Sequence, residues 1–97
     1  MRWVAIFQDD PGMLGVRKRH GQAHLNYLAE NENEILIGGG LRSGPGEPFA
    51  GGLWVLEVVS RDRAVKLIEN DPYYAPEVRS YRLFTWAKAL EDKIVQL

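Results

Sequence analysis

The sequence has no cysteine in its 97 residues. This absence excludes disulfide bonds, thiolate catalysis and metal sites built on cysteine ligands. It is compatible with any compartment and suits the cytoplasm, where disulfides are rare. We therefore expect a cytoplasmic protein whose chemistry relies on nitrogen and oxygen groups.

Long hydrophobic runs and an excess of charge are also missing. The apolar start, residues 1–7, turns polar at Gln8, which is too short for a signal-peptide core or a membrane span and is typical of a strand. Twelve Lys and Arg residues are balanced by thirteen Asp and Glu residues, which leaves a net charge of −1. This balance provides no electrostatic footprint for nucleic acid or an anionic membrane, so neither partner is expected.

The composition that remains is that of one ordinary globular domain. Apolar residues make up 45% of the chain and charged residues 26%, and no internal repeat is visible. We therefore expect a single domain over residues 1–97. A chain of this length buries only roughly 60–70% of its unfolded surface by folding alone, so association with a second copy would stabilise it.

Hydrophobic periodicity predicts six elements in the order βαββαβ. Strands are expected at residues 2–8, 35–37, 53–59 and 78–86, with helices from residues 17–20 to about 33 and from a Ser60 cap to about 70. The Gly/Pro-rich residues 38–52 are expected to form a loop, and the tail, residues 87–97, fits either a helix or a strand. Right-handed crossovers then place both helices on one face of a four-stranded antiparallel sheet, which is the ferredoxin-like α+β arrangement.

Three of the predicted strands, at residues 2–8, 53–59 and 78–86, are apolar on both faces. Two helices cover only one face, so a monomer would expose a larger apolar patch than soluble monomers normally tolerate. The tail is a poor lid for this patch, because five of its eleven residues have charged or amide side chains. We expect a homodimer in which two sheets pack face to face, a dimeric α+β barrel.

One acidic residue occupies an unusual position in this pattern. Asp71 follows Leu67 by one helical turn, so its carboxylate points to the core side of the second helix. Pro72 ends that helix, which puts the acid near backbone carbonyls where the potential is already negative. Such an acid needs a cationic or hydrogen-bonding partner. The clearest candidate is His24, which shares the inward face of the first helix with Leu28.

A carboxylate that is hydrogen-bonded to one imidazole nitrogen leaves the other nitrogen free to move a substrate proton. His24 and Asp71 are therefore candidates for an acid/base dyad, although the same pair serves equally well to tie two helices together. Three further residues are candidate substrate contacts because they lie near the pair in the predicted fold: Arg17, Tyr27 and Tyr73.

Four segments of the chain resemble the YCII-related (YciI-like) family of small dimeric α+β barrel proteins. They are residues 23–28 around His24, the Gly39-Gly40-Leu41 strand end, residues 52–58, and residues 70–73 around Asp71. The resemblance implies a homodimer with a pocket between helices and sheet and an active site at His24 and Asp71. Related barrels include lyases and isomerases that act on small cyclic compounds. Family members often have an arginine where this chain has Gly21, and Arg17, one turn earlier, is a candidate replacement.

Other kinds of site are disfavoured. His20 and His24 have the i, i+4 spacing of helical metal ligands, but no third ligand is apparent. Residues 38–52 lie between strands and lack Gly-Lys-Ser/Thr, so a flexible pocket rim is favoured over a phosphate site. RNA recognition needs aromatic and basic groups on the third strand, where residues 53–57 supply one aromatic and one acid. No metal, cofactor or nucleic acid is expected.

Together these features favour a cytoplasmic, cofactor-independent, dimeric enzyme of lyase or isomerase type that acts on a small organic substrate. In this hypothesis His24 is the acid/base and Asp71 orients it. The alternative is a non-catalytic ligand-binding or interaction module of the same fold.

Overall fold

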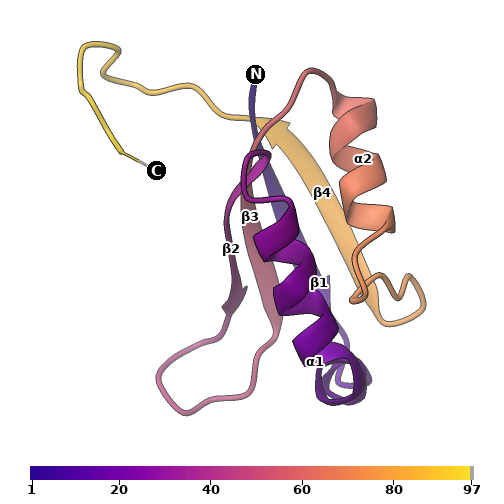
Figure 1. The fold of residues 1–97 in the computed structure, drawn as a ribbon. Helices are drawn as coiled ribbons and strands as arrows, with labels where there is room; N and C mark the ends of the chain where they lie inside the picture. Colours follow the sequence, from indigo (N-terminus) through magenta and orange to yellow (C-terminus); the bar gives the residue numbers. More distant parts are fainter. Residues whose placement is uncertain (97) are drawn as a thin grey trace.

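The computed structural model describes residues 1–96 and has the predicted βαββαβ order. The elements are β1 (Arg2–Asp9), α1 (Met13–Glu30), β2 (Ile35–Leu41), β3 (Gly51–Glu57), α2 (Arg61–Glu69) and β4 (Arg79–Thr85). The strands form one antiparallel sheet in the order β2-β3-β1-β4, and both helices lie on the same face of it (Figure 1). The ferredoxin-like α+β prediction is confirmed. Within residues 1–96, neither helix is both long and apolar enough to cross a bilayer.

The main core fills the space between the helices and the sheet. Alternate residues of the two central strands point toward the helices because side chains alternate between faces along a strand. These strand residues pack against the apolar stripe of α2. The buried members of the cluster are Ala5, Phe7, Ile35, Trp54, Leu56, Val58, Ala64, Leu67 and Ile68.

Helix α1 begins earlier and ends earlier than the sequence pattern predicted. The helix begins directly after a tight loop turn, in which the Met13 amide donates to the Asp10 carbonyl at 2.9 Å. Met13 and Val16 are buried in a second cluster with Tyr73, and this packing extends the helix ahead of the charged residues. At the other end the Asn31 side chain donates to the Tyr27 carbonyl at 2.8 Å, which caps the helix before the polar residues that follow.

Strand β2 extends through residues that were predicted to form a loop. Gly38 and Gly40 pair with Trp54 and Gly52 of β3, so only residues 42–50 connect the two strands. A Cβ at Gly51 would lie 2.2 Å from the Phe7 carbonyl oxygen, so only glycine permits the close approach of β3 to β1 at this position. The glycines therefore belong to the sheet, and they leave its helix-facing side without side chains at one end.

The second face of the sheet carries exposed apolar side chains on its central and edge strands. Ile6, Ile37 and Phe84 are 39%, 45% and 40% exposed, although they lie away from the chain termini. The tail beyond β4 forms no helix or strand over residues 86–96 and runs away from the sheet (Figure 1). The tail therefore leaves this face open, as its polar composition suggested.

Candidate active site

His24 and Asp71 are brought together from different helices. The distance from the imidazole Nδ1 to Asp71 Oδ1 is 2.7 Å, and the two residues are only 9% and 5% exposed. An ionised carboxylate can only accept hydrogen bonds, so this contact fixes a proton on Nδ1, and in the neutral imidazole the lone pair is then on Nε2. Nδ1 is the only ring nitrogen of His24 with a hydrogen-bond partner among residues 1–96.

The carboxylate of Asp71 is oriented by the turn that ends α2. Its Oδ1 also accepts the backbone N–H of Tyr73 at 3.1 Å, and its carbonyl accepts the N–H of Tyr74 at 2.8 Å. Pro72, between Asp71 and Tyr73, has no N–H to compete for these acceptors. An Asp side chain that bonds the backbone two residues ahead is an Asx turn. The Asp-Pro-Tyr segment therefore fixes both the acid and the aromatic ring that follows it.

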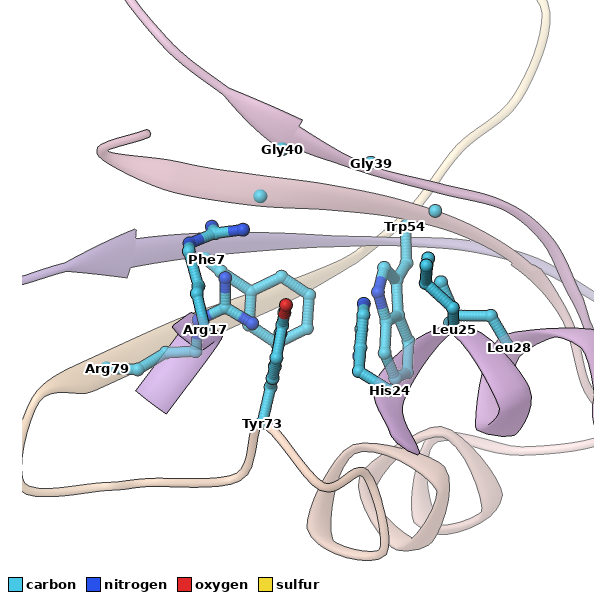
Figure 2. A pocket seen from close by; sticks show the side chains of 12 residues that line it. Phe7, Arg17, His24, Leu25, Leu28, Gly39, Gly40, Trp54, Tyr73 and Arg79 are labelled. Atoms are coloured by element: carbon cyan, nitrogen blue, oxygen red, sulfur yellow. The ribbon is translucent and has the colours of Figure 1, made fainter. Parts of the chain in front are cut away.

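Tyr73 lies against the imidazole. The two ring centroids are 3.7 Å apart and their planes differ by 5°, so the rings are stacked. Figure 2 shows Tyr73 between His24 and two arginines, with the phenol and imidazole side by side and directed toward the sheet. Only 7% of Tyr73 is exposed.

His24 and Tyr73 line a cavity of about 140 Å³ between α1 and the sheet (Figure 2). An engineered apolar cavity of about 150 Å³ accepts benzene, so this space suits one six-membered ring. Asp71 lies behind the imidazole, outside the lining. The lining residues are Phe7, Arg17, His24, Leu25, Leu28, Gly38, Gly39, Gly40, Gly52, Trp54, Tyr73 and Arg79.

Two arginines line the other end of the cavity and share one buried carboxylate, Asp9, which lies outside the lining. Asp9 pairs with Arg79 in the β1–β4 register, and Arg79 Nε donates to Asp9 Oδ1 at 2.7 Å. Arg17, from α1, donates through Nη2 to Asp9 Oδ2 at 3.0 Å and to the Gly51 carbonyl at 2.8 Å. Asp9 is almost fully buried, with 1% of its side chain exposed. The predicted substrate contact Arg17 therefore does lie at the cavity.

Tyr27 does not line the cavity, in contrast to the expectation that it contacts the substrate. Its hydroxyl donates to the Leu67 carbonyl at 2.6 Å, which ties α1 to α2. Burial and the nearby Asp71 charge raise the pKa of the Tyr27 hydroxyl. The reason for the difference is rotational: Tyr27 is at the edge of the inward face of α1 and turns toward the neighbouring helix.

Sequence reasoning missed several lining residues. Arg79 had no distinguishing motif, but its place opposite Asp9 at the end of two adjacent strands was the available signal. Gly38, Gly40 and Gly52 do line the cavity, as expected for a pocket rim, but they do so as paired strand residues and not as a flexible loop. Within residues 1–96, no group of three His, Asp or Glu side chains is arranged to hold a metal ion.

The assembled site has the groups needed to move a proton. It has an oriented imidazole with one free nitrogen, an acid that supports it, an aromatic wall and a cationic end, all around a space for one small ring. This arrangement suits general acid/base chemistry on a small molecule.

The sequence matches the model of the YCII-related domain over residues 1–87. No curated protein sequence matches the chain. Among solved structures, the fold is similar to that of 5-chloro-2-hydroxyhydroquinone dehydrochlorinase (TftG) from Burkholderia phenoliruptrix AC1100 in complex with 2,5-dihydroxybenzoquinone. The TM-score is 0.80 at 28% sequence identity, and the match covers 96% of this chain and 100% of that one.

Proposed function

The chain belongs to the YCII-related family, and from this premise we propose that it is a cofactor-independent enzyme that performs lyase or isomerase chemistry on a small cyclic substrate. His24 is the general acid/base in this proposal, and Asp71 orients it. The observation that carries the proposal is the 2.7 Å contact from Nδ1 to Asp71 Oδ1 behind a cavity that His24 itself lines.

The proposed reaction begins with the transfer of one proton from the substrate to His24. The free Nε2 of His24 takes a proton from a ring hydroxyl or ring carbon, and Asp71 stabilises the resulting imidazolium through Nδ1–H. The electron pair left on the substrate either expels a leaving group, as in a lyase, or takes a proton back at another ring position, as in an isomerase. Tyr73 contacts the imidazole on one face and helps to keep its orientation constant.

The class of substrate is suggested by the similar dehydrochlorinase, whose name describes a chlorinated and hydroxylated ring. A cavity sized for one ring supports a substrate of this kind. We therefore extend the proposal to small hydroxylated or quinonoid rings.

The proposed enzyme is a homodimer that acts in the cytoplasm. The exposed apolar face of the sheet, which includes Ile6 and Phe84, supports pairing with a second copy. The lack of cysteine suits a reducing compartment.

The test is an assay of 5-chloro-2-hydroxyhydroquinone and a library of cyclic acids and phenols, with release of halide and change of ring absorbance as readouts. For any substrate found, His24→Ala should lower kcat by at least about a hundredfold, the usual size of an acid/base contribution. Asp71→Asn should lower kcat less strongly. His20→Ala, on the same helix but outside the cavity, is the matched control. Turnover that survives both His24→Ala and Asp71→Asn in folded protein would reject the proposal.

A further inference from the structure

A second hydrogen bond joins the two helices beside the contact between His24 and Asp71. Tyr27 follows His24 by about one turn of α1, and its hydroxyl donates to the Leu67 carbonyl at 2.6 Å. Leu67 in turn precedes Asp71 by one helical turn. Residues with these spacings are neighbours on a helix surface. The Tyr27 hydrogen bond and the 2.7 Å contact of the dyad therefore lie side by side between the same two helices.

A third polar contact extends this row away from the dyad. Arg63 donates to the two carboxylate oxygens of Glu34, just before β2, at 2.9 and 2.7 Å. Arg63, Leu67 and Asp71 follow one another at intervals of one turn, so they share one side of α2 and of the turn that ends it. Of the other two contacts in the row, that of Tyr27 is the one next to the dyad.

The carbonyl that accepts from Tyr27 has lost its usual helical partner. In a continuing helix the Asp71 N–H would bond the Leu67 carbonyl, but it bonds the Ile68 carbonyl instead, at 3.2 Å. Pro72 causes this change, because a proline disfavours the α conformation in the residue before it. The Tyr27 hydroxyl takes the place of the diverted N–H. It therefore holds the turn of α2 from which Asp71 reaches His24.

Tyr27 can act on the dyad only through the position of the two helices. It is not among the residues that line the cavity, so it does not touch a ligand bound there. His24 and Asp71 are on different helices, and a hydrogen bond weakens once its heavy atoms separate beyond about 3.2 Å. A small change in helix spacing would therefore break the dyad. A short hydrogen bond one turn away is well placed to prevent that change.

We propose that Tyr27 is a positioning residue for the dyad, because its hydrogen bond to the Leu67 carbonyl sets the helix spacing at which His24 and Asp71 meet. The effect on turnover rests on the proposed function. The effect on the contact between His24 and Asp71 does not, because it is measurable without a substrate. The Glu34–Arg63 pair joins the same part of the molecule farther from the dyad and does not set this contact.

Tyr27→Phe tests the proposal because it removes the hydroxyl and keeps the ring. Nuclear magnetic resonance of the intact protein follows the His24 Nδ1–H. Its exchange with solvent should become at least about fivefold faster in Tyr27→Phe, the factor expected for one lost neutral hydrogen bond. Glu34→Gln is the matched control, since it breaks another contact in the row and should leave this exchange rate unchanged. Equal acceleration in both variants, or none in Tyr27→Phe, would overturn the proposal.

Kinetics provide a second measurement for any substrate that the assay identifies. Tyr27→Phe should lower kcat about fivefold and leave KM unchanged, because the acid/base pair is misaligned while the cavity lining is intact. Glu34→Gln should change neither constant. A rise in KM with an unchanged kcat would contradict a positioning role.

The unmodified protein supplies the test if Tyr27→Phe does not fold. An ionised tyrosine cannot donate, so the ring nitrogen resonances of His24 should move in step with the ionisation of Tyr27, followed through its ring carbon. Burial and the Asp71 charge raise the pKa of Tyr27 above 10.0, so this step lies at alkaline pH. The other charged groups around the hydroxyl, Asp71, Glu34 and Arg63, keep their charge there. His24 resonances that ignore the ionisation of Tyr27 would overturn the proposal.

The positioning role and the proposed function fail separately. Lost turnover in His24→Ala with an unchanged Nδ1–H exchange rate in Tyr27→Phe would reject the positioning role and keep the proposed function. Faster exchange in Tyr27→Phe with undiminished turnover in His24→Ala would do the reverse.

Discussion

The imidazole of His24 lies parallel to the phenol ring of Tyr73, with 3.7 Å between the ring centroids. The tyrosine is held there by its own backbone, because its N–H donates to the same Asp71 oxygen that binds the imidazole. One carboxylate oxygen therefore positions both rings. This coupling makes Tyr73 the residue whose replacement tests how far the orientation of His24 depends on packing.

Replacing Tyr73 with Ala should destabilise the protein by about 3 kcal/mol, the usual cost of truncating a buried aromatic side chain. Tyr73→Phe should retain most of the stability, because it keeps the stacked ring and loses only the hydroxyl. Urea unfolding measures both. Tyr74→Ala is the control, since Tyr74 is 41% exposed and its loss should cost far less. Equal destabilisation by the Tyr73 and Tyr74 changes would contradict the packing role.

The Tyr27 hydroxyl should make stability fall at alkaline pH. Burial and the Asp71 charge hold the pKa of Tyr27 in the folded protein above its ordinary value of 10.0. The unfolded chain therefore ionises first, and the stability that this proton contributes is lost as the pH rises from about 10 through the raised pKa. Tyr27→Phe should show a shallower alkaline decline in chemical denaturation, after a loss of about 1 kcal/mol at neutral pH from the missing hydrogen bond. A decline as steep as that of the unmodified protein would refute the assignment.

The Glu34–Arg63 pair should stabilise the protein at neutral pH and lose this effect in acid. Arg63 donates through Nη2 and Nε to the two carboxylate oxygens at 2.7 and 2.9 Å, and this pairing lowers the pKa of Glu34 below 4.5. Its contribution is fully present above about pH 4.5 and is lost as the pH falls through the lowered pKa. Glu34→Gln should lower the melting temperature at neutral pH and converge with the unmodified protein at low pH. Glu32→Gln, an exposed neighbour, should have no such pH-dependent effect.

Removing the buried carboxylate of Asp9 should be strongly destabilising. Asp9→Asn leaves Arg17 and Arg79 close together with no neutralising charge, and breaking a buried ion pair in this way typically costs about 3 kcal/mol or more. Asp10→Asn changes the adjacent exposed acid and should be nearly neutral. Denaturant unfolding of the two variants gives the comparison. Similar stabilities of Asp9→Asn and Asp10→Asn would contradict a stabilising role for the Asp9 carboxylate.

A charge on the open face of the sheet should prevent dimer formation. Phe84→Asp places a carboxylate at an exposed apolar position of β4, where burial against a second copy would require its desolvation. Light scattering after size-exclusion chromatography should then report a monomer, and a dimer for the unmodified protein. Leu14→Asp introduces the same charge on α1 and should leave the dimer intact. A monomeric unmodified protein would reject the dimer.

Much of the fold was predictable because its strands and helices carry strong local signals. Residues 2–8 and 53–59 are rich in aromatic and β-branched types, and Ser60 caps α2 by accepting the Arg63 N–H at 3.2 Å. The boundary error at β2 has a tertiary cause. Glycines predict loops from composition alone, but Gly38 and Gly40 pair with β3, a tertiary contact that no local pattern reveals.

The site was predictable in part for the same reason. His24 and Asp71 were identified because each is a titratable residue on the apolar face of a helix, which periodicity can show. Arg79 was missed because its role depends on register, which brings it opposite Asp9 from 70 residues away. Tyr27 was assigned to the cavity because a helical wheel gives a direction but not the position of the neighbouring helix.

The glycine side of the cavity limits how the protein can adapt to a ligand. Side chains adjust by changing rotamers, but Gly39, Gly40 and Gly52 have no rotamers, and their backbone is fixed by pairing between β2 and β3. Adjustment must therefore come from the side chains that line the rest of the cavity. A single methyl group, as in Gly52→Ala, would lie 3.2 Å from both Arg79 Nη2 and the Gly39 carbonyl oxygen, so it would crowd the arginine at the edge of the cavity.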